Sequence, residues 1–286
     1  MVGFQTLSVE QMIARCTKLP VCPVLFTRLT SALQNPTQNI CDLGEIISMD
    51  PVLTAKVLKA ANSAYYGLSR TVRSVDDAII RLGFEEIFSV AAAAKAREMF
   101  AATNQWEGFG DAIWSHALAT AVFARTLARK IVARRVEDAY YTAALLHDFG
   151  KLMFSQIDIS YPVLCNYGAI HGEPLIEREM QRYGATHAHL GGELLRQWRL
   201  PAVLVSAVEN HHQTVPPSAV VEPQNLIVTA ADFLAHASQQ TCVNGMVNFV
   251  PQLPDYLATR LPISRDDLTI IISESARQIE MLDAAA

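Results

Sequence analysis

The amino-acid sequence predicts an all-α protein, and three observations support that prediction. Helix-capping signals divide the chain into segments of helical length, apolar residues recur at helical spacing within them, and the Val-rich alternation typical of strands is scarce. The 286 residues are 51% hydrophobic and 18% charged. This composition excludes a disordered chain and provides ample apolar material for a buried core.

The N-terminal part of the chain begins with three predicted helices. Ser8 and Gln11 form a capping box for a helix over about residues 9–18. Prolines on both sides delimit a second helix over 24–34, and a third helix is expected around 42–48.

Capping residues also mark the next two helices. Asp50 caps a helix that has Pro51 at its first position, where a missing backbone N–H costs nothing. Ser74 and Asp77 form a second capping box, and the helix that they begin ends at Gly83.

The remainder of the chain is also predicted to be helical. The segment 102–111, with two glycines, is the best candidate for a boundary between subdomains, and residues 241–263 contain prolines typical of loops and short turns. Helices are expected over residues 84–101, 111–133, 137–156, 172–183, 187–198, 201–211, 222–238 and 264–282. We therefore expect an N-terminal helical subdomain, a second helical subdomain, and a C-terminal loop and helix, over residues 1–105, 106–240 and 241–286.

Charge and cysteine content exclude several classes of protein. The net charge of -5 creates no field that attracts nucleic acid. The five cysteines are odd in number and form no CxxC pair, as expected of reduced thiols. We see neither a secretory signal nor an uninterrupted apolar run of about 18 residues, so no membrane association and a cytoplasmic location are expected.

Histidines and aspartates between residues 116 and 232 are candidate metal ligands. Imidazole and carboxylate are ligand types that divalent metal ions select. Two of the acids, Asp148 and Asp232, lie in strongly apolar stretches, where an uncompensated carboxylate costs several kcal/mol. The candidate ligands are His116, His147, Asp148, His187, His211, His212 and Asp232.

Each of these residues also has a structural explanation when taken alone. His116 is compatible with a satisfied core histidine, and the His147-Asp148 pair with a polar pair at a core cavity. The C-terminal dipole of the preceding helix would also favour a positively charged histidine at 211 or 212. Lys151 lies three residues after Asp148, on the same helical face, where it could neutralise a phosphate. We expect His171 and His236 to be surface residues.

The order of the candidate ligands, with LLHDFGK at its centre, resembles the HD superfamily of metal-dependent phosphohydrolases. The flanking sequence is similar to a narrower family. The segments DPVLTAKVLKAANSAYYG, IWSHALATAVFARTLA, THAHLGGELLRQWRLP, VENHH and ADFLAHA resemble the HDOD family (HD-related output domain) of bacterial signalling proteins, over about residues 18–238.

The resemblance implies an N-terminal helical subdomain packed on an HD-type helical bundle, and an output or scaffold role in signal transduction. Signalling partners would be supplied in trans. It also implies one or two divalent ions (Fe, Mn, Ni or Zn) on a largely intact HD site. In that site His187, His211 and His212 correspond to the extra ligands of two-metal relatives, the HD-GYP cyclic dinucleotide phosphodiesterases.

Two features of those two-metal relatives are missing. Ala112 stands where they place a glutamate ligand, although Asp111 is adjacent, and no GYP motif follows His211 and His212. Cyclic-di-GMP hydrolysis is therefore not expected, whereas a metal site is.

Three hypotheses about function follow. The first is a signalling module that uses its metal site without turnover. The second is an active metal-dependent phosphohydrolase acting on a nucleotide or other phosphoester, with Asp148 binding or bridging metal and Lys151 clamping a phosphate oxygen. The third is nucleic-acid binding through a helix-turn-helix around residues 42–62, supported by basic residues nearby. The third is disfavoured because Leu53 and Val57 on the would-be recognition helix have core character.

Overall fold

The structure, a computed structural model, describes residues 7–18, 40–103, 108–131, 137–171, 174–213, 223–243, 246–247 and 252–286. Within these ranges the regular secondary structure is helical apart from two two-residue strands, so the all-α prediction is confirmed. None of the helices described is long and apolar enough to cross a membrane. The helix predicted over 24–34 lies outside the described residues.

Three of the N-terminal helices begin at the predicted capping residues, although α1 ends at Arg15, before the predicted residue 18. Ser8 accepts a hydrogen bond from the Gln11 backbone N–H, and the Gln11 side chain accepts from the Ser8 N–H. Asp50 accepts from two backbone N–H groups of the helix that it caps, and Gly83 ends another helix at φ +91°. These helices are α1 (Val9–Arg15), α3 (Ile40–Ser48), α4 (Pro51–Ala61), α5 (Val75–Leu82) and α6 (Phe84–Thr103).

The rest of the described chain forms most of the molecule. The helices are α7 (Phe109–Ile131), α8 (Glu137–Leu146), α9 (Phe149–Ile157), α10 (Tyr161–His171), α11 (Leu175–Tyr183), α12 (His187–Gln197), α13 (Ala202–Asn210), α14 (Pro223–Thr241), α15 (Asp255–Ala258) and α16 (Arg265–Ala285). The strands β1 (Cys242–Val243) and β2 (Met246–Val247) pair antiparallel, with Cys242 opposite Val247.

The prediction of one long helix over 137–156 is wrong, because the chain breaks into α8 and α9 at His147 and Asp148. Asp148 has φ -97° and ψ 5°, outside the helical region, and it begins α9 without a side-chain cap. The break accompanies a close approach of α9 to α12, where a Cβ on Gly150 would lie 2.0 Å from the carbonyl oxygen of His187. Tertiary packing therefore decides the break.

A second difference is α10, for which no helix was predicted. Its second residue is Pro162, which is tolerated in the first turn because the N–H groups there have no partner within the helix. The helix predicted over 172–183 is shorter and begins at Leu175.

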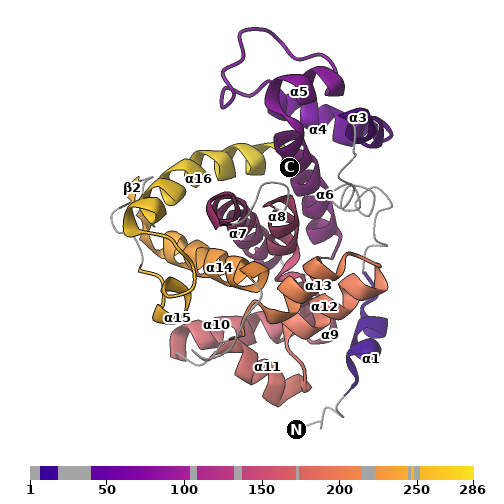
Figure 1. Cartoon of the computed structure of the whole chain (residues 1–286). Coiled ribbons are helices and arrows are strands. Elements are labelled where there is room, and N and C mark those ends of the chain that lie inside the picture. Colours follow the sequence, from indigo (N-terminus) through magenta and orange to yellow (C-terminus); the bar gives the residue numbers. More distant parts are fainter. Residues whose placement is uncertain are drawn as a thin grey trace.

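The helix α7 lies at the centre of the molecule, with other helices packed around it (Figure 1). It packs against α8, α14 and α16, while α6 packs against α4, α7, α8 and α9. The run Ala91–Ala94 in α6 is fully buried, and α7 buries residues along almost its whole length. Small side chains allow neighbouring helices to approach closely. The helix α8 is thereby held against α7, while α12 packs on α9 and α13.

The C-terminal helix α16 also packs on α4, the helix considered above as a recognition helix. Lys56 and Lys59 of α4 donate hydrogen bonds to the backbone carbonyls of Ala286 and Ala284, at 2.7 and 2.9 Å. Leu53 on the same helix is fully buried. This helix is therefore part of the packed structure, and two of its basic side chains are used in internal contacts.

Candidate metal centre

The structure brings together every residue predicted as a metal ligand. His116 comes from the middle of α7, and Asp232 from α14. His147 and Asp148 lie at the break between α8 and α9, His187 begins α12, and the remaining two histidines follow the last residue of α13. All are buried except His212, which is half-buried: His116, His147, Asp148, His187, His211, His212 and Asp232.

Two groups of donor atoms face the carboxylate of Asp148. In the first group, His116 Nε2 lies 2.8 Å from Asp232 Oδ1. His147 Nε2 lies 3.6 Å from that same oxygen and 3.4 Å from Asp148 Oδ2. His116 Nε2 is 3.8 Å from Asp148 Oδ2. We call His116, His147 and Asp232 the first group.

The second group contains three histidines on the other side of Asp148. His187 Nε2 lies 3.2 Å from Asp148 Oδ1, and His211 Nε2 lies 3.8 Å from it. His187 Nε2 is also 3.4 Å from His211 Nε2 and 3.0 Å from His212 Nε2. We call His187, His211 and His212 the second group.

Asp148 is common to both groups, because Oδ2 faces the first and Oδ1 faces the second. One potential ligand atom from each of Asp148, His187, His211 and His212 lies within 4.8 Å of the others, and the same holds for His116, His147 and Asp148. The ligand atoms of a single ion lie within a few ångströms of one another, because each is about 2.0–2.2 Å from the ion. The geometry is therefore consistent with metal binding on both sides of Asp148.

Hydrogen bonds at Nδ1 aim the other ring nitrogen into the centre. His147 Nδ1 is 2.5 Å from the Ala144 carbonyl, and His211 Nδ1 is 2.6 Å from the Val208 carbonyl. A carbonyl oxygen only accepts, so each Nδ1 carries the proton. In the neutral rings Nε2 then presents a lone pair to the centre, as a metal ligand requires.

Buried polar atoms of the centre lack a hydrogen-bond partner among the described residues, and they include His147 Nε2 and Asp148 Oδ1. Burial disfavours a charged His147, but Asp148 and Asp232 outweigh it and raise the pKa of His147 to about 10. Burial and the neighbouring histidines lower the pKa of His211 well below its usual value. A proton on His147 balances part of the carboxylate charge, and a divalent ion that displaces it would meet imidazole nitrogens and carboxylates, the ligands that such ions select.

Lys151 lies beside Asp148, as its spacing predicted. Its Nζ is 2.6 Å from Asp148 Oδ2. Burial opposes the charge of Lys151, but the carboxylate of Asp148 outweighs it and raises the pKa of Lys151 to about 12. The ammonium group therefore remains charged next to the centre.

Sequence reasoning missed Glu179, which lies behind the second group. This residue of α11 is fully buried. It accepts hydrogen bonds from the His187 backbone N–H at 2.8 Å, from His187 Nδ1 at 2.9 Å, and from the Tyr161 hydroxyl. A carboxylate behind a metal-binding histidine fixes the ring and its tautomer. The sequence has no local signal for this contact, because it joins two different helices.

His236 was expected to be a surface residue, and its side chain is 53% exposed. It also lies one turn after Asp232 on α14, with Nδ1 3.1 Å from Asp232 Oδ1. Its ring centroid is 4.1 Å from that of His116. The i,i+4 spacing from Asp232 was the signal that could have found it. The side chain of His171 lies outside the described residues.

Comparison with known proteins identifies a matching family and several relatives. Residues 19–214 match the HDOD domain family. A Treponema pallidum (strain Nichols) protein is 26% identical over 234 residues, which cover 79% of this chain and 44% of that protein. The chain thus spans less than half the length of this relative.

Solved structures share the fold at low sequence identity. An HDOD domain protein of unknown function from Geobacter sulfurreducens is 21% identical, with a TM-score of 0.72 over 97% of this chain and 95% of that one. A Marinobacter aquaeolei VT8 protein, provisionally named a signal transduction protein, is 21% identical, with a TM-score of 0.72 over 99% of this chain and 61% of that one. A Shewanella amazonensis SB2B protein, provisionally named a phosphohydrolase, is 22% identical, with a TM-score of 0.68 over 96% and 98%.

Proposed function

Because the chain belongs to the HDOD family, we propose that it is a bacterial signal-transduction output protein whose HD-type centre binds one or two divalent metal ions. The observation that carries this proposal is the position of Asp148, which presents one carboxylate oxygen to each of two groups of donors. The provisional name of the Marinobacter relative supports the signalling role. We expect the partners to be signalling proteins supplied in trans, and the protein to act in the cytoplasm without nucleic acid.

The donor chemistry favours transition metals. The first group would hold one ion with Asp148, and the second group would hold another. Imidazole ligands suit Fe, Ni or Zn, and the carboxylates would also suit Mn, whereas Mg and Ca prefer all-oxygen ligands.

A second candidate function is metal-dependent phosphoester hydrolysis, and the position of Lys151 favours it. Its charged Nζ lies next to Asp148, where it could bind a phosphate oxygen electrostatically. A divalent ion at the centre would supply a Lewis acid for a phosphoryl group. The Shewanella relative is provisionally named a phosphohydrolase. A nucleotide or another phosphoester is the expected substrate, and the missing GYP motif argues against cyclic-di-GMP.

Elemental analysis of protein purified without chelator tests the metal centre. We expect one or two ions of Fe, Mn, Ni or Zn per chain. Asp148→Ala should lose metal from both groups because Asp148 is shared, whereas Asp266→Ala, which alters an exposed aspartate of α16, should keep it. Metal-free wild-type protein would contradict the proposal.

A hydrolysis screen of metal-loaded protein separates the two candidate functions. Phosphomonoesters, nucleotides and cyclic dinucleotides are the substrates to compare. Turnover that disappears in folded Lys151→Ala protein with its metal retained would support the hydrolase. Full metal content without turnover on any of these substrates would leave the signalling role.

A further inference from the structure

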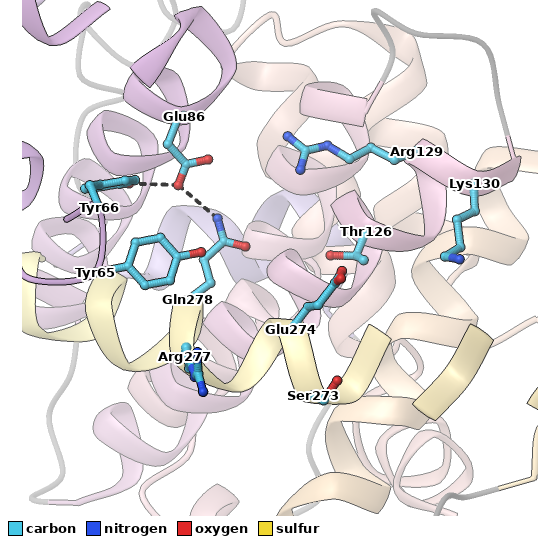
Figure 2. Close-up of a pocket in the computed structure, with 10 residues that line it drawn as sticks. All are labelled: Tyr65, Tyr66, Glu86, Thr126, Arg129, Lys130, Ser273, Glu274, Arg277 and Gln278. Carbon is cyan, nitrogen blue, oxygen red and sulfur yellow. Dashed lines mark hydrogen bonds between the residues drawn. The ribbon is translucent and has the colours of Figure 1, made fainter. Parts of the chain in front are cut away.

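A cavity lies away from the metal centre, between α16 and parts of α6 and α7 (Figure 2). Its volume of about 820 Å³ falls within the range of small-molecule sites, roughly 300–1,000 Å³. Thr126 of α7, which lines the cavity, is ten residues beyond His116, or about 15 Å along the helix. A ligand in this cavity would therefore occupy a different site from the metal ions.

The inner end of the cavity is a closed hydrogen-bond network around Glu86. One carboxylate oxygen accepts from the Tyr66 hydroxyl at 2.8 Å and from Gln278 Nε2 at 3.0 Å, as Figure 2 shows. The other accepts from the buried guanidinium of Arg125 at 2.9 Å. Glu86 is thus neutralised and held in place, so it contributes a rigid wall rather than a free negative charge.

One side of the cavity is the aromatic ring of Tyr65. The side chain is 42% exposed although it is large and apolar. The edge-to-face contact with Tyr66, at 4.9 Å and 84°, holds the ring in place. Figure 2 shows the Tyr65 hydroxyl directed into the cavity. An exposed and oriented ring of this kind offers a stacking surface for a planar group.

The opposite side carries positive charge. Arg129 pairs with Glu85 at 3.1 Å, but both side chains are 43% exposed, so the pair is weak and a ligand anion can replace it. Lys130 lies on the same last turn of α7. Its Nζ pairs with Asp267 Oδ1 at 2.6 Å, a second part-exposed pair that a ligand anion would have to replace. Arg277 of α16, which Figure 2 shows on the Tyr65 side of the cavity, is exposed and has no ion-pair partner among the described residues.

We propose that this cavity binds a nucleotide, with its base against Tyr65 and its phosphate against Arg129 and Lys130. An aromatic ring together with cations is the combination that recognises a planar base joined to a phosphate. Glu274, which also lines the cavity, supplies an acceptor for N–H groups of the base. Inorganic phosphate would leave both the ring and most of the volume unused.

Calorimetric titration of the full chain with AMP and with GMP tests the site. EDTA in the buffer keeps the metal centre from binding phosphate, so the result does not depend on the function proposed above. We expect saturable binding of one nucleotide per chain. Tyr65→Ala should weaken it by about fivefold or more, because stacking is lost, whereas Tyr65→Phe should retain it.

Charge reversal tests the phosphate half of the site. Arg129→Glu should weaken binding by about tenfold. Arg265→Glu is the control, because Arg265 is also an exposed arginine but does not line the cavity. Absence of nucleotide binding, equal losses in the two arginine variants, or equal affinity for inorganic phosphate would each overturn the proposal.

Discussion

Replacing Glu179 with glutamine tests whether the centre depends on a residue that would not touch metal. Both carboxylate oxygens of Glu179 accept hydrogen bonds, from two N–H groups of His187 and from the Tyr161 hydroxyl. A glutamine keeps one acceptor oxygen and turns an NH₂ group toward the other donors. The carboxylate charge is then lost at a fully buried position, and His187 Nδ1 keeps an acceptor only if the amide oxygen faces it.

The size of the effect follows from those contacts. Loss of the partner behind a metal-binding histidine typically lowers metal affinity by about 10–100-fold, or about 1.4–2.7 kcal/mol. A buried donor left without a partner also costs about 1–3 kcal/mol of folding free energy. Only the second group contains His187, so the first group should keep its affinity.

Competition between the protein and a chelating dye for Zn²⁺ measures both affinities. Glu177→Gln is the matched control, because Glu177 is exposed on the same helix. We expect the affinity for one of the two Zn²⁺ ions to fall in Glu179→Gln and both affinities to stay unchanged in the control. Two unchanged ions, or two ions weakened equally, would refute the assignment of Glu179 to the second group.

Three further predictions concern the same centre. Gly150→Ala should destabilise the fold by about 1–3 kcal/mol in urea denaturation, because the added Cβ meets the His187 carbonyl at 2.0 Å; wild-type stability would argue against this close approach. The carboxylates beside His147 overcome its burial and raise its pKa to about 10, so an ion must displace a proton below that pH. Zn²⁺ affinity should then rise about tenfold per pH unit between about pH 7 and about pH 9, and a flat profile would contradict this linkage. His236→Ala should lower the affinity of the first group for its ion by about tenfold in the dye assay, whereas His189→Ala, at an exposed site, should not. Equal affinities in the two variants would show that His236 does not support the first group.

Most helix boundaries were predictable because they depend on neighbouring residues. The Ser8 capping box and the Asp50 cap use side chains that bond to backbone N–H groups two or three residues away. The break at His147 was not predictable in this way. Continuous apolar spacing across 137–156 favours one helix, and only the approach of α12 to Gly150 shows why the chain turns there.

The candidate site shows the same division. The identities and order of the histidines and aspartates are in the sequence, and so is the position of Lys151 relative to Asp148. The residues that hydrogen-bond to the ligands from behind cannot be predicted in this way, because Glu179 contacts His187 only when α11 packs beside α12. His236 is an intermediate case, since its spacing from Asp232 is local but its contact with His116 is not.

The sequence by itself determined that the protein is helical and which residues are candidate ligands, because helix periodicity and ligand chemistry are local properties of the chain. Only the tertiary structure decided that Asp148 faces two groups of donors, and that a polar cavity with an aromatic wall lies at the other end of α7. Both arrangements join residues from several helices. Their distances depend on how the helices pack, which no single segment specifies.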